Sequence, residues 1–194
     1  MTTIYLVRHG EVHNPEGVIY GWLPGYRLSE RGRAEVVDAA DSIANSLAED
    51  GSIDVLITSP LERAQESAGI LAARLGSRIA SGPITEPRIA ETDVAGYQGK
   101  SFDTLPTPYI TEEGLPGIEG AASMRARLLE WVADISGKYE RIVAVSHRDP
   151  IGVLLLHLAG ADLSQLGPMG LATGSVHEIH IDGDVMRASG PALQ

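Results

Sequence analysis

Three short polar clusters in this chain each follow directly on an apolar stretch of sequence. The clusters are Arg8-His9 after residues 4–7, Ser59 and Arg63 after residues 54–58, and Ser146-His147 after residues 141–145. Because ligands of open α/β sheets bind at the carboxyl ends of the strands, we expect the three clusters to meet in one crevice. Together they supply two imidazoles and two guanidiniums, groups that bind a phosphoryl dianion and can accept it covalently. The residue types therefore predict phosphoryl-transfer chemistry.

His9 is the predicted nucleophile of this chemistry, and the product of its attack would be a phosphohistidine. Neighbouring guanidiniums disfavour a charged imidazole, so they keep His9 in its neutral, nucleophilic form. No carboxylate cluster of the kind that holds Mg²⁺ accompanies these residues, so the sequence predicts neither a metal nor a cofactor. His9 and His13 have the i, i+4 spacing of a metal-binding pair, but they lack a helical context.

Length and composition favour a single globular domain that covers residues 1–194. With 194 residues, 43% of them apolar, the chain is long enough for one α/β domain with a sizeable core. Its net charge of −11 repels nucleic acid and anionic lipid. No apolar run reaches about 18 residues, the length of a membrane span. We therefore expect a cytoplasmic protein that binds a small phosphomonoester and neither nucleic acid nor membranes, and that can form a homodimer.

The apolar pattern predicts alternating strands and helices, which is typical of a mostly parallel sheet. Strands are expected over residues 4–8, 54–58 and 141–146, with a brief one in 78–87 and a terminal hairpin of 175–181 and 185–188. Helices are expected over residues 30–49, 60–75, 121–138 and 150–160, with Ser29, Ser59 and Asp149 capping the first, second and fourth. The result would be a three-layer α/β/α sandwich, with two long loops, 11–28 and 91–117, as caps over the strand ends.

The polar clusters resemble the motifs of the histidine phosphatase superfamily, also called phosphoglycerate mutase-like. The matching segments are Arg8-His9-Gly10-Glu11, Ser59-Pro60-Leu61-Glu62-Arg63-Ala64 and Val145-Ser146-His147, in this order along the chain. The resemblance implies a phosphoglycerate mutase-like fold and a phosphoric monoester hydrolase of the histidine acid phosphatase type. It also implies that His9 becomes phosphorylated while Arg8, Arg63 and His147 bind the phosphoryl oxygens.

The resemblance further implies a glutamate that protonates the leaving group. Glu91 fits this role best, because the segment Ile89-Ala90-Glu91, followed by Gly96, matches the family's pattern of apolar-x-Glu followed by glycine. His9, Glu91 and His147 are then the implied catalytic residues. Asp93 stays open as an alternative proton donor, because the spacing from Glu91 to Gly96 is about one residue longer than in the common pattern.

Other contacts to the substrate follow from the same resemblance. Asn14 is implied as a further phosphate ligand. Arg148 and Asp149 replace two glycines that are common after the motif histidine, and the backbone N–H of Arg148 can still bind phosphate. Asp149 is expected to turn away and cap the helix. The residues expected to line the substrate pocket are Tyr20, Trp22 and Arg27.

Two other functions remain open. A phosphoglycerate mutase-type phosphotransferase would need cations for a substrate carboxylate, for which Arg88, Arg125 and Arg127 are the nearby residues. A catalytically weak module would instead only bind a phosphorylated ligand. The intact Arg8-His9-Gly10 motif with Arg63 and His147 favours the leading prediction, a metal-independent phosphomonoesterase that acts through phosphohistidine on a small phosphorylated metabolite.

The remaining histidines are assigned structural positions. His157 lies in an apolar helical stretch and is predicted to be packed in the core. His177 and His180 lie on opposite faces of a terminal strand, where we expect solvated or cross-strand positions.

Overall fold

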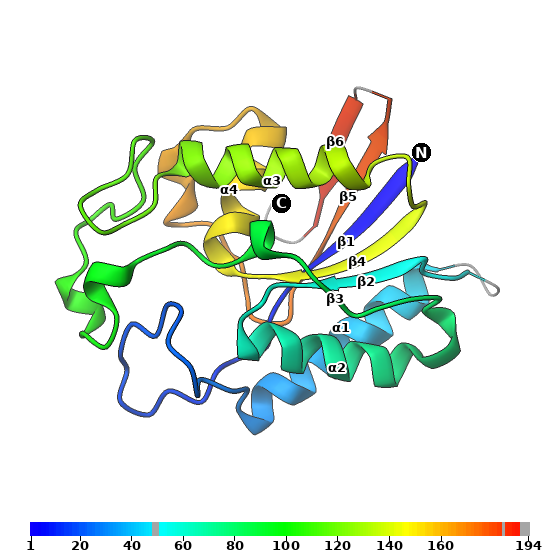
Figure 1. The fold of residues 1–194 in the computed structure, drawn as a ribbon, viewed down its shortest axis with the longest axis horizontal. Helices are drawn as coiled ribbons and strands as arrows, with labels where there is room; N and C mark the ends of the chain where they lie inside the picture. The colour runs from blue at the N-terminus through cyan, green and yellow to red at the C-terminus, as the bar shows by residue number, and fades with distance from the viewer. Residues whose placement is uncertain (48–50, 184, 191–194) are drawn as a thin grey trace.

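The computed structural model describes residues 1–47, 51–183 and 185–190, and a six-stranded sheet runs through its centre (Figure 1). In spatial order the strands are β3 (Ile84–Thr85), β2 (Val55–Thr58), β4 (Arg141–Ser146), β1 (Thr2–Arg8), β5 (Val176–Asp182) and β6 (Val185–Ser189). The first four strands run parallel to one another, β5 pairs antiparallel with β1, and β6 pairs antiparallel with β5. The sheet is therefore mostly parallel, as predicted, and the terminal hairpin forms one edge.

Helices cover both faces of the sheet, which confirms the predicted α/β/α sandwich (Figure 1). The helices are α1 (Glu30–Ser46) and α2 (Glu62–Leu75) on one face, with α3 (Ala121–Ile135) and α4 (Arg148–Ala159) on the other. Alternate residues of β1 divide between the two cores. Tyr5 and Val7 pack on the α1 and α2 side, whereas Ile4 and Leu6 pack on the α3 and α4 side. Burial on both faces explains why the central strands have continuous apolar sequences.

The two predicted caps are ordered segments that share an apolar cluster with α3 and α4. Ile19 of the first cap is buried in this cluster together with Val94 and Ile110 of the second cap. Met124 of α3 packs against them. The caps are therefore held in place by buried surface, and side chains from both can line one site.

The first and third helices end earlier than predicted. Ser29 is the N-cap of α1, as predicted, and its Oγ accepts the N–H of Gly32 at 3.0 Å. This helix ends at Ser46, and its predicted last residue, 49, lies outside the described residues. α3 ends at Ile135 because Gly137, with a φ of 76°, adopts a left-handed conformation. None of the helices in the described ranges is long and apolar enough to cross a membrane.

The predicted N-caps of the second and fourth helices are wrong. α2 begins at Glu62, and the hydroxyl of Ser59 instead lies 2.7 Å from Nε2 of His147. Asp149 falls inside the first turn of α4, and its carboxylate accepts the hydroxyl of Tyr109. In both places a tertiary partner takes the side chain that the local sequence pattern assigns to a cap.

Of the three histidines with predicted structural positions, His157 lies elsewhere, whereas His177 is a cross-strand neighbour as predicted, opposite Leu6 of β1. His157 is exposed in the last turn of α4 and does not belong to the core. His177 is fully buried, with Nε2 at 3.1 Å from the hydroxyl of Ser175, and burial lowers its pKa to about 4. His180 is a cross-strand neighbour as predicted, with Nδ1 at 3.2 Å from the hydroxyl of Thr3.

A close contact between two glycines holds the segment after β1 against the start of α1. A Cβ atom on Gly10 would lie 2.1 Å from the carbonyl oxygen of Gly32. A Cβ atom on Gly32 would in turn lie 2.0 Å from the carbonyl oxygen of Glu11. Because real Cβ contacts are never this short, only glycine at both positions permits the observed approach. The residue between Arg8 and Gly10 is His9, so this contact also positions the predicted nucleophile.

We expect Gly32→Ala to destabilise the protein by about 1–3 kcal/mol, as overpacking does, because the new methyl group pushes the segment after β1 away from α1. Gly69→Ala is the matched control, because Gly69 also lies in a helix but has open space around its Cβ position. That substitution should stabilise the protein by up to about 1 kcal/mol through helix propensity. Urea unfolding of both variants measures the difference, and equal stabilisation by the two would refute the close contact.

Candidate active site

The three polar clusters meet at the carboxyl ends of β1, β2 and β4, as predicted. β1 and β4 are paired in register, with Arg8 opposite Ser146, and the backbone N–H of His9 donates to the carbonyl of Ser146 at 3.1 Å. The imidazole rings of His9 and His147 lie with their centroids 5.0 Å apart, at an interplanar angle of 60°. Arg63 reaches the same point from the first turn of α2. Parallel pairing therefore delivers side chains from distant parts of the sequence to one place.

The hydrogen bonds of His9 define its tautomer. Nδ1 lies 2.8 Å from the carbonyl oxygen of Gly10, which can only accept, so Nδ1 carries the ring proton. Nε2 accepts the Nε–H of Arg63 at 3.2 Å, so its lone pair faces the site. Burial lowers the pKa of His9 well below its usual value, and the charges of Arg63 and Arg8 lower it further. The ring is neutral, and its in-plane lone pair is on Nε2, where it accepts the hydrogen bond from Arg63.

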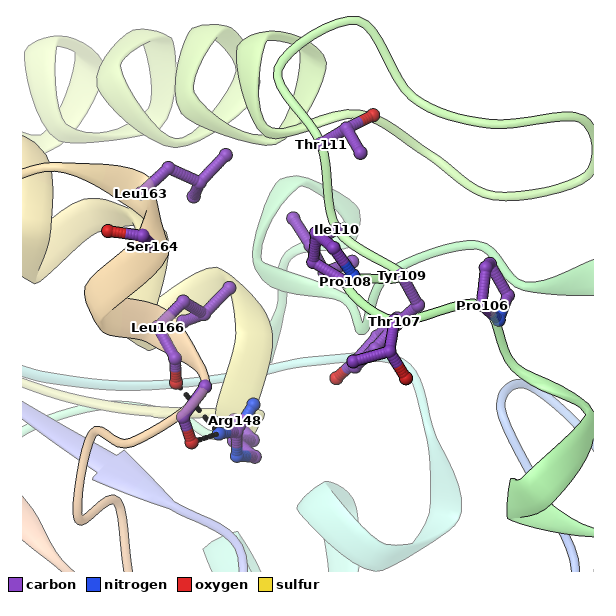
Figure 2. A pocket seen from close by; sticks show the side chains of 11 residues that line it. Pro106, Thr107, Pro108, Tyr109, Ile110, Thr111, Arg148, Leu163, Ser164 and Leu166 are labelled. Carbon is purple, nitrogen blue, oxygen red and sulfur yellow. Dashed lines mark hydrogen bonds between the residues drawn. The ribbon is translucent and has the colours of Figure 1, made fainter.

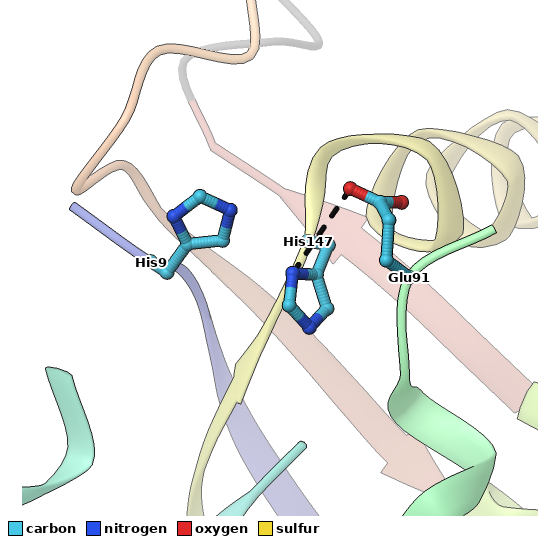
Figure 3. A group of neighbouring side chains, drawn as sticks. All are labelled: His9, Glu91 and His147. Carbon is cyan, nitrogen blue, oxygen red and sulfur yellow. Dashed lines mark ion pairs between the residues drawn. The ribbon is translucent and has the colours of Figure 1, made fainter. Parts of the chain in front are cut away.

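The tautomer of His147 is set by Ser59. The Ser59 hydroxyl accepts the backbone N–H of Leu61 at 3.3 Å, and its own proton is free to donate to Nε2 of His147 at 2.7 Å. Nδ1 of His147 then carries the ring proton and is a donor. Burial and the charge of Arg63 lower the pKa of this imidazole too. Figure 3 shows Nδ1 facing the carboxylate of Glu91, whose Oε2 lies 4.0 Å away.

Glu91 is held at the site by its backbone as well as by its side chain. Its carbonyl oxygen accepts the indole N–H of Trp22 at 2.9 Å, and its Oε1 accepts the backbone N–H of Thr92 at 2.9 Å. Burial raises the pKa of Glu91 to about 7, and the negative charge of Asp149 adds to this effect. Arg63 acts in the opposite direction. A carboxyl group with this pKa can both give and take a proton near neutrality.

Asp149 faces the site, which corrects the prediction that it turns away to cap α4. It lines the same pocket as Glu91 and is almost completely buried. Tyr109 donates its hydroxyl to this carboxylate at 2.7 Å, and Nη1 of Arg148 donates to it at 2.8 Å. These two donors stabilise a negative charge next to the site, where the local sequence predicted only a helix cap.

Three buried nitrogen donors around the two imidazoles have no acceptor. They are Nε of Arg8, Nη2 of Arg63 and Nδ1 of His147, and none has a hydrogen-bond partner in the described part of the chain. Leaving buried polar groups unpaired is costly, so native structures rarely do so without a functional reason. A tetrahedral oxyanion offers several acceptor oxygens to such a set. The arrangement is therefore suited to binding a phosphoryl group.

The same place also contains a set of potential metal ligands. One ligating atom each from His9, Glu91 and His147 lies within 4.8 Å of the other two (Figure 3). The guanidiniums of Arg8 and Arg63 adjoin these atoms and influence the pKa values of His9 and Glu91. Because two fixed positive charges disfavour a cation and favour an anion, this set fits a phosphoryl dianion better than a metal ion.

The structure brings Tyr20 to the site but places Arg27 and Asn14 elsewhere. Tyr20 lines the pocket with Arg8, and its ring lies under the guanidinium of Arg63, whose central carbon is 4.8 Å from the ring centroid. The prediction that Arg27 lines the pocket is wrong, because its side chain is 71% exposed and its Nε lies 4.0 Å from Oε2 of Glu62. Asn14 has no contact that supports phosphate binding: its amide donates to and accepts from the backbone of Val18 and so closes a local loop.

The other residues named from the sequence, Trp22, Asp93 and Arg148, lie at different places around the site. The indole of Trp22 supports the backbone of Glu91 from outside and is half-exposed. Asp93 accepts the backbone N–H of Ala95 and is exposed, so the geometry favours Glu91 as the residue at the site. Arg148 is the first residue of α4, where backbone N–H groups lack intrahelical acceptors. The predicted contact between the backbone N–H of Arg148 and phosphate requires such an unpaired N–H group.

Sequence reasoning missed Tyr109 and the role of Ser59. Tyr109 lies in the second cap, far from any motif, and no local pattern connects it with Asp149. The sequence already places Ser59 at the carboxyl end of its strand with the other clusters, but it assigns the hydroxyl to a helix cap and does not show the hydrogen bond to His147.

Comparison with known proteins agrees with this fold. Residues 4–191 match the model of the histidine phosphatase superfamily (branch 1). The uncharacterized protein Rv0525 of Mycobacterium tuberculosis is 35% identical over 170 residues, which cover 84% of this chain and 81% of that protein. YhfR of Bacillus stearothermophilus has a similar structure, with a TM-score of 0.79 and 25% identity over 99% of this chain and 97% of that one. Mycobacterial glucosyl-3-phosphoglycerate phosphatase Rv2419c superposes with a TM-score of 0.75, at 20% identity over 98% and 97% of the two chains.

The unpaired donors predict that Arg63→Lys weakens the binding of vanadate or inorganic phosphate by at least about tenfold, because a charge-assisted hydrogen bond is lost. Lysine keeps the charge but loses both the Nε–H that faces His9 and the planar fork. Arg27→Lys is the control, since Arg27 is exposed outside the site, and its affinity should not change. Isothermal titration of both variants gives the comparison, and equal affinities for Arg63→Lys and the unchanged protein would exclude Arg63 from the anion site.

Proposed function

Since the chain belongs to the histidine phosphatase superfamily (branch 1), we propose that it hydrolyses phosphomonoesters through a phosphohistidine formed on His9, without a metal or cofactor. The observation that carries this proposal is the set of three unpaired buried donors beside a neutral imidazole whose unprotonated nitrogen, Nε2, faces the site. A structural neighbour that is by name a phosphatase supports the hydrolase class. The substrate is a small phosphorylated metabolite.

In the first step, Nε2 of His9 attacks phosphorus in line with the ester oxygen. The Nε2–P bond forms while the bond from phosphorus to the alcohol oxygen breaks. The unpaired donors of Arg8, Arg63 and His147 bind the phosphoryl oxygens, whose charge redistributes in the transition state. Glu91 gives its proton to the departing alcohol, which a carboxyl group with a pKa of about 7 can do near neutral pH.

In the second step, water hydrolyses the phosphohistidine. Glu91 is now a carboxylate, and it takes a proton from the water molecule that attacks phosphorus. The P–Nε2 bond breaks, the electron pair returns to His9 and phosphate leaves. The pKa of His9 stays low because of burial and the adjacent guanidiniums, so the released ring remains neutral and ready for the next cycle.

The geometry favours hydrolysis over the phosphoglycerate mutase alternative. The three arginines considered for a substrate carboxylate are all engaged by carboxylates of the protein itself. The pairs are Arg88 with Glu86, Glu130 and Asp134, Arg125 with Glu112, and Arg127 with Glu119. Arginines neutralised in this way contribute little to binding a second anion. A module that only binds phosphate is also disfavoured, because it has no use for Glu91 beside the donors.

We expect Glu91→Gln to slow the hydrolysis of an alkyl phosphate by about 10²–10⁴-fold, the usual contribution of general acid–base catalysis. With p-nitrophenyl phosphate the leaving group needs no proton, so attack by His9 remains fast while hydrolysis of the phosphohistidine becomes slow. Rapid-mixing assays with EDTA present should then show a burst of nitrophenolate close to one per active site. The trapped protein should carry an acid-labile, base-stable phosphate.

His9→Ala is the control for this experiment and should show neither burst nor phosphoenzyme. Asp93→Asn is the control for the alternative proton donor and should keep full activity, since Asp93 is exposed beside the site. If Glu91→Gln slows both substrates equally without a burst, Glu91 is not the proton donor. Loss of all activity of the unchanged protein in EDTA, restored by a divalent metal, would contradict the metal-independent mechanism.

Asp149→Asn should move the alkaline limb of the pH profile to lower pH. Glu91 must be protonated in the first step, so kcat/KM for an alkyl phosphate should fall as pH rises through about 7. The negative charge of Asp149 raises the pKa of Glu91, so its removal lowers that pKa and activity is lost earlier. Ionisation of the substrate is the same for both proteins, so the difference between the two profiles reports on Glu91. Superimposable profiles would show that Asp149 does not influence the proton donor.

A further inference from the structure

We propose that the alcohol half of the substrate is apolar and extends from the catalytic pocket into a neighbouring cavity, an inference that rests on the proposed function. The proposal names a substrate class, phosphomonoesters of apolar alcohols, and a subsite for the alcohol. It is carried by the size of the two cavities, by their shared walls and by the charges around them.

The catalytic pocket is small, and part of its wall is apolar. Its volume is about 190 Å³, and Arg8, Glu91 and Asp149 are among the residues that line it. The apolar residues of its wall are Ile19, Val94, Phe102 and Leu105. Phe102 of this wall is 52% exposed, so it is accessible to a ligand. Ligand pockets usually measure about 300–1,000 Å³, so a phosphoryl group and its alcohol need more space than this pocket contains.

The neighbouring cavity supplies that space (Figure 2). It has a volume of about 720 Å³ and lies between residues 106–111 of the second cap and residues 163–167 after α4. Apolar side chains such as Ile110 and Leu166 form much of its lining. Tyr109 and Arg148 line both this cavity and the catalytic pocket, so the two spaces adjoin at these side chains.

The charges at this junction exclude a second anionic group on the substrate. Arg148 is the one cation among the residues that line the larger cavity, all of which lie in the described part of the chain. Its guanidinium donates to Asp149, and to the carbonyl oxygens of Leu166 at 2.8 Å and Gly167 at 3.1 Å. A guanidinium with three acceptors of its own protein has little capacity left for a substrate carboxylate, and the charge of Asp149 repels one. An uncharged, apolar alcohol fits both the walls and this charge balance.

The test compares butyl phosphate with octyl phosphate, both below the concentration at which octyl phosphate aggregates. A fully buried methylene contributes about a fourfold gain in binding, so the longer ester should have a kcat/KM at least about tenfold higher. Gly167→Trp should remove this preference by filling the cavity. Gly167 has a φ of −57° and open space at its Cβ position, so the backbone tolerates a side chain there. Ser164→Trp, which fills the cavity from another exposed position, is the second variant.

Gly170→Trp is the matched control, because Gly170 is also exposed with open space at its Cβ position but does not line the cavity. It should keep the octyl preference of the unchanged protein. Equal kcat/KM for the two esters, or a preference that survives both cavity-filling variants, would contradict the apolar subsite and leave the phosphatase proposal intact. A higher kcat/KM for 3-phosphoglycerate than for octyl phosphate would also contradict it. Failure to release phosphate from any ester would instead overturn the proposed function itself.

Discussion

The buried guanidinium of Arg63 is the group on which the rest of the site depends. It is 1% exposed, it donates to the free nitrogen of His9, and its Nη2 has no partner in the described part of the chain. A cation so deeply buried is costly unless charge or hydrogen bonds compensate for the lost water. Tyr20 contributes a ring face, and Glu91 contributes opposite charge nearby. The part of the positive charge that these two groups do not compensate attracts a phosphoryl dianion into the site.

Burial shifts the pKa of the carboxyl group and the pKa values of the imidazoles of this site in opposite directions. It lowers the pKa values of His9 and His147, whose charged forms are cationic, and raises that of Glu91, whose charged form is anionic. Below a pH of about 7 these three groups are therefore mostly neutral, and the arginines supply the positive charge that faces the substrate, with the carboxylate of Asp149 beside them. One environment thus prepares a nucleophile, a hydrogen-bond donor and a proton donor together.

The pair Arg148-Asp149 connects the catalytic pocket with the second cap. Arg148 donates to Asp149 at the start of α4, and Asp149 accepts the hydroxyl of Tyr109 in the second cap. This network joins the sandwich to the cap at the point where the catalytic pocket adjoins the larger cavity. The same carboxylate that tunes Glu91 therefore also neutralises the arginine at the entrance to the proposed alcohol subsite.

The sequence by itself determined the sandwich, its central strands and the residues at the strand ends. Those features are local: continuous apolar runs predict strands buried on both faces, and polar residues directly after them must lie at the edge of the sheet. His9, Arg63 and His147 could therefore be assigned to one crevice from the order of residues alone, and Glu91 could be named through its motif.

Only the tertiary structure decided where Asp149, Ser59, Tyr109 and Arg27 point. Asp149 and Ser59 have good local uses as helix caps, but partners distant in the sequence offer better ones, because a buried hydroxyl or carboxylate must be hydrogen-bonded. Tyr109 and Arg27 lie in the two loops that cover the strand ends, and these loops have no periodic pattern. The positions of the two residues therefore depend on how irregular backbone packs through long-range apolar contacts. Such contacts are a property of the whole fold, and no short stretch of sequence contains them.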